Sequence, residues 1–199
     1  MSKITGQEKT QDVPQKVMLL YKAVAEMIAE GVDVNNISVA AITEKAGIGK
    51  GTAYEYFNSK EDILVCAIIY YVQNIYEQIS TMLAPCEGFA QRIALLLEEM
   101  EHGGDKECCI VRYVHIMTDN SGIGRMVAQK MKEEPLCHYL PYAVLTDMLQ
   151  HAVERGEVRA DLPMDYMVFT LFSKLMTYFM YINAEGPVRM PCGQIRPYL

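Results

Sequence analysis

The stretch from Ser38 to Leu64 contains the side chains most suited to bind a partner, and its pattern predicts two short helices. Ser38 is a good N-cap, placed just before apolar residues at helical spacing. Gly47 ends that helix, since glycine readily takes the left-handed conformation that follows a helix end. A second short helix is expected from about Lys50, with Ala53 and Phe57 facing inward and its two tyrosines on other faces. Two short helices joined by a tight glycine-containing turn are typical of a helix-turn-helix, whose second helix enters the DNA major groove.

Two longer helices are expected to position this pair. An amphipathic helix begins near Pro14 and ends at Gly31, and its apolar stripe recurs every three or four residues. That stripe would cover both short helices and complete a three-helix head. Ser59 followed three residues later by Asp62 is a cap-like start for a long helix that continues without a linker to about residue 82. A continuous rod would therefore join the head to the rest of the chain.

The remaining sequence also predicts helices alone. The expected helices begin near residues 89, 105, 123, 141 and 163, and glycine or proline marks most of their ends. Neither an internal repeat nor a strand pattern is present, and the tail after Gly186 and Pro187 has no regular pattern. The expected fold is all-α with about nine helices, divided into a head of residues 1–58 and a helical domain of residues 59–199.

Many fixed-offset matches in one window resemble the DNA-binding domain of the tetracycline-repressor (TetR) family of bacterial transcription regulators. The family pattern is an Ala-Gly turn, a Thr-x-Tyr-x-x-Phe recognition helix and a Ser-Lys-Glu-x-Leu opening of the next helix. This chain carries it as Ala46-Gly47, Thr52-Ala53-Tyr54-Glu55-Tyr56-Phe57 and Ser59-Lys60-Glu61-Asp62-Ile63-Leu64. The resemblance implies a homodimeric regulator, most simply a repressor, that binds a palindromic DNA operator and is released by a ligand.

The resemblance also implies which residues face DNA, namely Ser38, Val39, Lys50, Gly51, Thr52, Tyr54, Tyr56 and Lys60. Lys50 would donate to the major-groove acceptors of a base, most plausibly guanine. The tyrosine hydroxyls would reach phosphates, as would the open N–H groups where the helix at Ser38 begins, and Lys60 matches the family's phosphate-clamping lysine. Glu55 departs from the pattern, because a carboxylate near phosphates is repulsive unless it accepts from a cytosine amino group.

The second domain is expected, from the family, to bind an effector between its middle helices and to form a dimer with its last two. The chain has fourteen methionines and thirteen tyrosines but no tryptophan, and no cluster of arginines suggests a phosphate ligand. A small, mostly apolar or aromatic effector is expected, because apolar residues with a few hydroxyls are usual in ligand pockets. The candidate lining is Tyr71, Ile75, Phe89, Ile93, Leu97, Met100, Tyr113 and Met117, although the same stripes also suit a plain core.

The last helix is apolar on more than one face, so the candidate dimer interface is Leu145, Leu149, Phe169, Phe172, Met176 and Phe179. Effector binding would move the long helix and change the separation of the two heads.

Charge and hydropathy limit the other possibilities. The net charge is −7, and residues 1–62 carry seven lysines and no arginine against nine acidic residues. A generally basic footprint is therefore absent, and the remaining local charge comes from lysines near the start and from Lys45, Lys50 and Lys60. No signal peptide is apparent, and the apolar stretch from Tyr166 to Ile182 has Ser173 and Lys174 at its middle. The expected protein is cytoplasmic and has no membrane partner.

Two alternatives remain open, a metal- or thiol-responsive regulator and an interaction protein, whereas an enzyme is not expected. Cys108 and Cys109 near His115, or Cys137 beside His138, could gather a soft metal in a metal- or thiol-responsive regulator, but no ligand spacing supports this, and no metal or other cofactor is expected. An enzyme is not expected, because the four histidines are scattered and no nucleophile elbow, phosphate loop or zinc-protease motif is present. A dimeric helical interaction protein whose head no longer binds DNA is kept in view by the acidic head.

Overall fold

The computed structural model is entirely helical in the part that it describes. That part comprises Ile4, Gly6, residues 12–102, Ile116, Asp119, and residues 122–133, 136–139 and 141–183. The α-helices are α1 (Gln15–Ala29), α2 (Val39–Lys45), α3 (Lys50–Tyr56), α4 (Lys60–Leu83), α5 (Phe89–His102), α7 (Gly122–Lys130), α8 (Pro141–Glu154) and α9 (Met164–Asn183). Two short 3-10 turns, η2 (Val34–Asn36) and η4 (Leu136–Tyr139), complete the described elements. The all-α prediction is confirmed. The helix expected from Asp105 and the tail after residue 183 lie outside the described residues.

The chain divides into two compact units. The first contains residues 1–79 and 107–140, and the second contains residues 80–106 and 141–199. The division passes through α4, whose last residues, 80–83, belong to the second unit. The boundary predicted after residue 58 separates the DNA-binding head from the rest by expected function, whereas the two compact units are separated by packing. That boundary stays a prediction.

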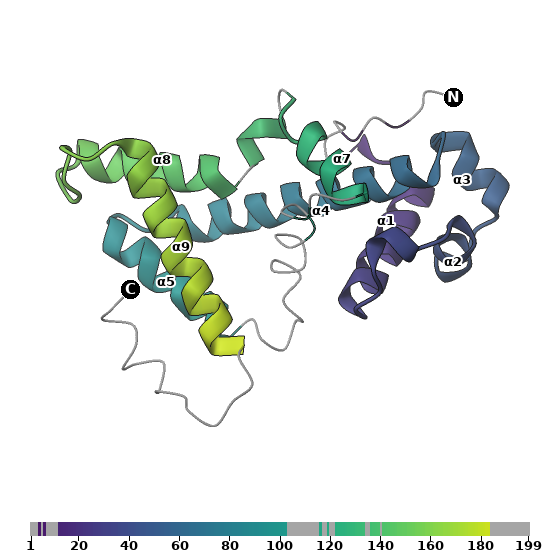
Figure 1. The fold of residues 1–199 in the computed structure, drawn as a ribbon, viewed down its shortest axis with the longest axis horizontal. Coiled ribbons are helices and arrows are strands. Elements are labelled where there is room, and N and C mark those ends of the chain that lie inside the picture. Colours follow the sequence, from purple (N-terminus) through teal and green to yellow (C-terminus); the bar gives the residue numbers. More distant parts are fainter. Residues whose placement is uncertain are drawn as a thin grey trace. The chain divides into compact units, whose positions relative to one another are not determined.

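In the first unit, α1, α2 and α3 gather at the N-terminal part of α4 (Figure 1). Pro14 directly precedes α1, as predicted. Gly31 lies just beyond the end of α1 with φ of +84°, the left-handed conformation expected of a glycine at a helix end. The inward stripe of α1 includes Leu20 and Tyr21, which are fully buried and pack with Phe57 and the first turns of α4. Each buried side chain of this size contributes about 1.5–3 kcal/mol relative to exposure, so α1 anchors the two short helices.

Helix α4 begins at the predicted cap. The Ser59 hydroxyl accepts from the Asp62 N–H at 3.1 Å, and the Asp62 carboxylate accepts from the Asn58 N–H at 3.1 Å. These bonds satisfy N–H groups that a helix start would leave open. All residues from Ile63 to Tyr70 are buried, which places this part of α4 at the centre of the unit.

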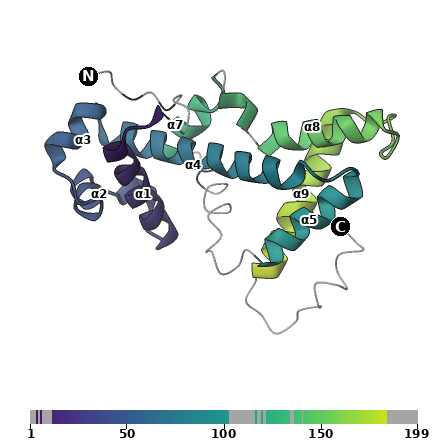
Figure 2. The ribbon, with the colours of Figure 1, turned by 180° about the vertical axis from the view of Figure 1, so that it is seen from behind.

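The first unit is larger than the three-helix head that the sequence predicts. Helix α7 lies beside the same part of α4 (Figures 1 and 2), and Ile123, Val127 and Met131 join the core formed by α1 and α4. Leu136 of η4 is fully buried in the same core. The head is therefore continuous with a segment that comes from the middle of the chain.

The second unit packs α8 against both α5 and α9. Helix α8 ends before Gly156, which has φ of +71°, and the following loop folds back so that Glu157 accepts from the Phe89 N–H at the start of α5 at 2.5 Å. Tyr178 of α9 is fully buried, and its hydroxyl donates to the Glu101 carboxylate of α5. Tyr142 of α8 also donates from its hydroxyl to Asp165 of α9, so polar contacts join the three helices in addition to their apolar packing.

Candidate DNA-binding surface and effector domain

The second helix of the motif presents an open face. Gly49 precedes α3, and Lys50 at its first position is exposed, with no hydrogen bond or ion pair to any described residue. Tyr54, one turn further on, is 47% exposed, and no atom lies within 4 Å of the place where a side chain on Gly51 would begin. Thr52 is half-buried. A helix with a lysine, an exposed tyrosine and an open backbone on one side can approach a groove closely.

Tyr56 differs from its expected place. Sequence analysis puts it on a face other than that of Ala53 and Phe57, but it is only 6% exposed. The physical reason is helical spacing, because position 56 is three residues after the buried Ala53 and therefore shares its face. Its backbone carbonyl also accepts from the N–H of Ile4 at 3.0 Å. The inward face of α3 is thus Ala53, Tyr56 and Phe57, and a role for Tyr56 on DNA is untested.

The supporting helix α2 starts as predicted. The Ser38 hydroxyl accepts from the Ala41 N–H at 3.2 Å, and Ser38 itself is exposed. Val39 is half-buried and packs against the core of the first unit, so its side chain secures α2 rather than facing outward. Gly47 has φ of +66° in the turn to α3. The cap at Ser38, the packing of Val39 and the turn at Gly47 together determine how α3 is positioned by α2.

The three lysines around the motif have different surroundings. Lys45 pairs at 2.6 Å with Glu30, which directly follows α1, and Glu26 of α1 lies 3.7 Å from the same ammonium. The hydrogen bond to Glu30 raises the pKa of Lys45, and this lysine ties α2 to α1. Lys60 donates to the backbone carbonyl of Asn35 at 3.0 Å. Lys50 is therefore the lysine of this group whose charge no described residue offsets.

The predicted effector residues fall in both units. Tyr71 and Ile75 belong to the first unit, and Phe89, Ile93, Leu97 and Met100 belong to the second, while Tyr113 and Met117 lie outside the described residues. Leu97 is buried, and the other three residues of α5 are half-buried. The effector lining stays a prediction.

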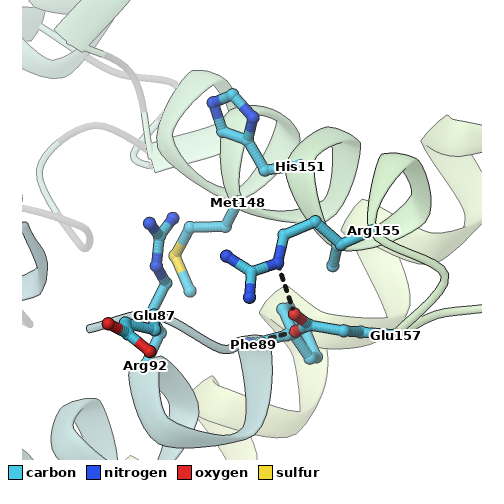
Figure 3. Close-up of a pocket in the computed structure, with 8 residues that line it drawn as sticks. Glu87, Phe89, Arg92, Met148, His151, Arg155 and Glu157 are labelled. Carbon is cyan, nitrogen blue, oxygen red and sulfur yellow. Dashed lines mark hydrogen bonds and ion pairs between the residues drawn. The ribbon is translucent and has the colours of Figure 1, made fainter.

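A cavity of about 160 Å³ lies within the second unit (Figure 3). Its lining is Glu87, Phe89, Arg92, Met148, His151, Ala152, Arg155 and Glu157. Phe89 is the one predicted effector residue among them. Arg155 pairs with Glu157 at 2.8 Å, as the dashed line in Figure 3 marks, and Arg92 donates to the Cys86 carbonyl at 3.3 Å. Sequence analysis found no arginine cluster, because Arg92 and Arg155 are far apart in the chain and only packing of α5 on α8 brings them together.

The predicted dimer residues divide into two groups. Leu145, Leu149 and Phe179 are buried within the chain itself, so their side chains have little area left for a second copy. Phe169 is 63% exposed, and Phe172 and Met176 are half-buried. The structure adds Tyr166, 58% exposed, and Met180, 68% exposed, which share a stripe with Phe169 and Met176. Their spacing of three and four residues was present in the sequence as a signal.

The described residues contain no group of three or more histidine, cysteine or acidic side chains that could hold a metal. Cys66 and Cys86 are buried, and neither is in a disulfide. The adjacent Cys108 and Cys109, which the metal alternative invokes, lie outside the described residues. No helix in the described part is long and apolar enough to span a bilayer.

The fold and the exposed α3 define a helix-turn-helix protein, a DNA-binding transcriptional regulator. Residues 19–66 match the model of the bacterial regulatory proteins of the tetR family, a span that runs from α1 into α4. The DNA-binding segment of the chain is therefore that of the TetR family. The predicted family and the predicted class of function are both confirmed.

Relatives and solved structures extend the likeness beyond the head. The chain is 25% identical over 149 residues to the fatty acid metabolism regulator protein of Bacillus subtilis (strain 168), covering 74% of this chain and 73% of that protein. The structure of the fatty acid degradation regulator FadR from Bacillus halodurans matches with a TM-score of 0.67 at 18% identity, covering 86% of this chain and 84% of that one. The transcriptional regulator FadR from Bacillus subtilis in complex with stearoyl-CoA matches with a TM-score of 0.65 at 22% identity, covering 83% and 86%. The structural likeness establishes the fold of both parts of the chain.

Proposed function

We propose that this regulator is a homodimeric repressor that binds a palindromic operator through α3 and leaves it when a small amphiphilic effector binds the second unit. The observation that carries the DNA-binding part is the exposure of Lys50 and Tyr54 on a helix whose opposite face is buried. Acting on DNA, the protein would work in the cytoplasm. Because the net charge is negative, pairing of two heads has to supply much of the affinity that a basic surface would otherwise give.

The exposed stripe of α9 supports the dimer. We define the α9 stripe as Tyr166, Phe169, Met176 and Met180. Large apolar side chains exposed at this spacing on a single chain favour burial against a partner, and a two-fold dimer buries the same stripe twice. Tyr142 of α8 stands beside the stripe, since its ring lies 5.9 Å from that of Phe169 and its hydroxyl donates to Asp165. That hydrogen bond raises the pKa of Tyr142 and holds the ring against α9.

The effector that similarity favours is a long-chain fatty acyl thioester. The relatives described above are named for fatty acid metabolism or degradation, and one of them is bound to stearoyl-CoA. The half-buried apolar residues of α5 suit an acyl chain. The cavity of about 160 Å³ is smaller than the roughly 300–1,000 Å³ of usual ligand sites, so it cannot take the chain by itself. Its lining mixes Arg92, Arg155 and His151 with Glu87 and Glu157, so it presents charges of both signs at the start of α5.

The DNA-binding part is tested by selecting genomic fragments on the purified protein. A palindrome whose half-sites lie one helical turn apart, about 34–36 Å, is the expected product. Recovery of fragments that share no inverted repeat would favour the alternative of a helical interaction protein.

The effector part is tested on the selected operator with three compounds: stearoyl-CoA, CoA alone and stearate. Release by stearoyl-CoA at concentrations at which CoA and stearate have no effect is expected, because chain and head each contribute binding energy. Effector coupling is typically about 1–3 kcal/mol, which corresponds to a change in operator affinity of about 5- to 150-fold. Operator affinity that does not change with stearoyl-CoA would exclude this effector and leave the DNA-binding proposal standing.

A further inference from the structure

Asn35 in η2 bonds to the beginnings of two other helices. Its side-chain Oδ1 accepts from the N–H of Ile123 at the start of α7 at 3.1 Å, although the two residues are far apart in the chain. Its backbone carbonyl accepts from the ammonium of Lys60, the first residue of α4, at 3.0 Å. One residue of the head therefore contacts both α7 and the lysine that the family resemblance assigns to a phosphate. All of these residues belong to the first unit.

Asp33 holds Asn35 in a defined orientation. The Asp33 carboxylate accepts from the Asn35 backbone N–H at 3.0 Å and from the Asn35 side-chain Nδ2 at 3.2 Å. Because Nδ2 is committed to Asp33, Oδ1 is the atom that faces α7, which agrees with its acceptor role toward Ile123. The neighbouring Asn36 also donates to Asp33, at 3.0 Å, but makes no hydrogen bond to Lys60 or to the described residues of α7.

The close approach of η2 to α7 depends on a glycine. Gly122 has φ of +45°, and a Cβ at this position would lie 2.1 Å from Asn35 Oδ1. Two separate requirements therefore exclude a side chain there, the left-handed backbone and the steric contact. The Ile123 N–H is one of the open donors of the α7 start, so Asn35 caps α7 from a distant part of the chain. Ile123 itself is buried in the core shared with α4.

The bond between Asn35 and the start of α7 matters because of where α7 lies in the chain. Residues 107–140 return to the first unit between two segments of the second, at residues 80–106 and 141–199. The chain therefore connects the second unit to the first at α7 as well as at α4. The bond from Asn35 to α7 leads directly to the loop between α1 and α2.

We infer that Asn35 is a positioning residue that couples the start of α7 to Lys60, and so to the phosphate contact of the head. Displacement of α7 pulls on Asn35 Oδ1, shifts the carbonyl that holds the Lys60 ammonium, and changes where that ammonium lies on DNA. This inference rests on the proposed function for its DNA step. The α7–Asn35–Lys60 coupling itself is a property of the protein alone and is testable without DNA.

The first experiment uses the protein without DNA. The rate at which Lys60 is labelled by an acylating reagent is measured, with the exposed Lys50 as internal reference. Asn35→Ala keeps the backbone carbonyl but removes the bond to α7, and it is expected to raise Lys60 labelling roughly threefold or more relative to Lys50. Gly122→Ala, which forces η2 and α7 apart, is the second variant and is expected to have the same effect. Asn36→Ala is the matched control and should label as the wild type does.

The second experiment adds the operator. Hydrogen exchange of the α7 amides is expected to slow when the wild-type protein binds DNA, because coupling is reciprocal, and this slowing is expected to be lost in Asn35→Ala but kept in Asn36→Ala. Equal Lys60 labelling in wild type, Asn35→Ala and Gly122→Ala would overturn the inference, as would α7 protection that is the same in Asn35→Ala as in wild type. Failure of the wild type to bind any selected DNA would instead count against the proposed function, and the labelling result would still decide the coupling.

Discussion

At the scale of the residue, three lysines of one type have three different roles. Lys45 is held by the carboxylates of α1 and stabilises the packing of α2, whereas Lys60 is held by a backbone carbonyl. Lys50 projects from the first position of α3 with its ammonium unengaged by the described residues. In the sequence alone, the three lysines are equivalent sources of positive charge. Their contacts in the structure are what give them different roles.

Lys50→Ala is expected to lower affinity for the operator more than affinity for unrelated DNA. A lysine that donates to the two acceptors of guanine discriminates by about 1–3 kcal/mol, which is a factor of roughly 5 to 150. Binding to the operator and to a scrambled duplex of equal length, at one salt concentration, measures this ratio. Equal losses on both duplexes would show that Lys50 contacts phosphate rather than a base.

Lys60→Ala is expected to weaken binding to all sequences alike and to reduce the slope of log affinity against log salt by about 0.9 for each lost phosphate contact. Lys130→Ala, on the exposed side of α7 where Lys130 pairs with Glu133, is the control and should leave the slope unchanged. An unaltered slope in Lys60→Ala would remove this residue from the DNA contacts. Its remaining role would then be the bond to Asn35.

At the scale of the element, helix ends determine the geometry of the motif. The turn between α2 and α3 depends on Gly47 in the left-handed conformation, and the start of α2 depends on the Ser38 cap. Both are local features, so the sequence predicts them well. The direction in which α3 points follows from this turn and from the burial of Ala53 and Phe57 against α1 and α4.

Gly47→Ala is expected to reduce the free energy of unfolding by about 1 kcal/mol, because an L side chain is disfavoured at positive φ. No atom lies within 4 Å of the added Cβ, so the loss comes from the backbone alone. Gly51→Ala is the matched control, since Gly51 is helical and its surroundings are equally open. Alanine should stabilise that position by about 0.5–1 kcal/mol. Urea unfolding measures both, and changes of the same sign in the two variants would contradict the backbone explanation.

At the scale of the whole molecule, the function that we propose requires two copies acting together. A single short recognition helix on an acidic protein offers few contacts, and a palindromic operator requires two heads at fixed spacing. The α9 stripe is the surface that we assign to the partner. Leu145 and Leu149, expected at the same interface, are buried within the single chain, and their place in the interface stays a prediction.

Phe169→Glu is expected to convert the dimer to a monomer at micromolar concentration, because it places a charge at the centre of an apolar stripe. Light scattering on the eluting protein measures the mass. Affinity for the full palindrome should fall at least about 100-fold, while affinity for a single half-site should stay unchanged. Gln129→Glu adds the same charge on the exposed side of α7 and should remain dimeric. A dimeric Phe169→Glu protein would place the interface elsewhere.

The sequence by itself determined the helices, their ends and the motif, because capping by Ser38 and Ser59, the stops at Gly31, Gly47 and Gly156, and the 3.6-residue period are encoded within a few neighbouring positions. The family model matches residues 19–66, which include this motif, because it depends on the same local sequence pattern.

Only the tertiary structure decided which helices share a core and which side chains meet. It brought α7 into the unit of the head, joined Asn35 to Ile123 and Lys60, and placed Arg92 near Arg155. These contacts join residues that are distant in sequence, and no local signal encodes them. They follow from how the apolar faces of several helices pack at once, which is a property of the whole chain.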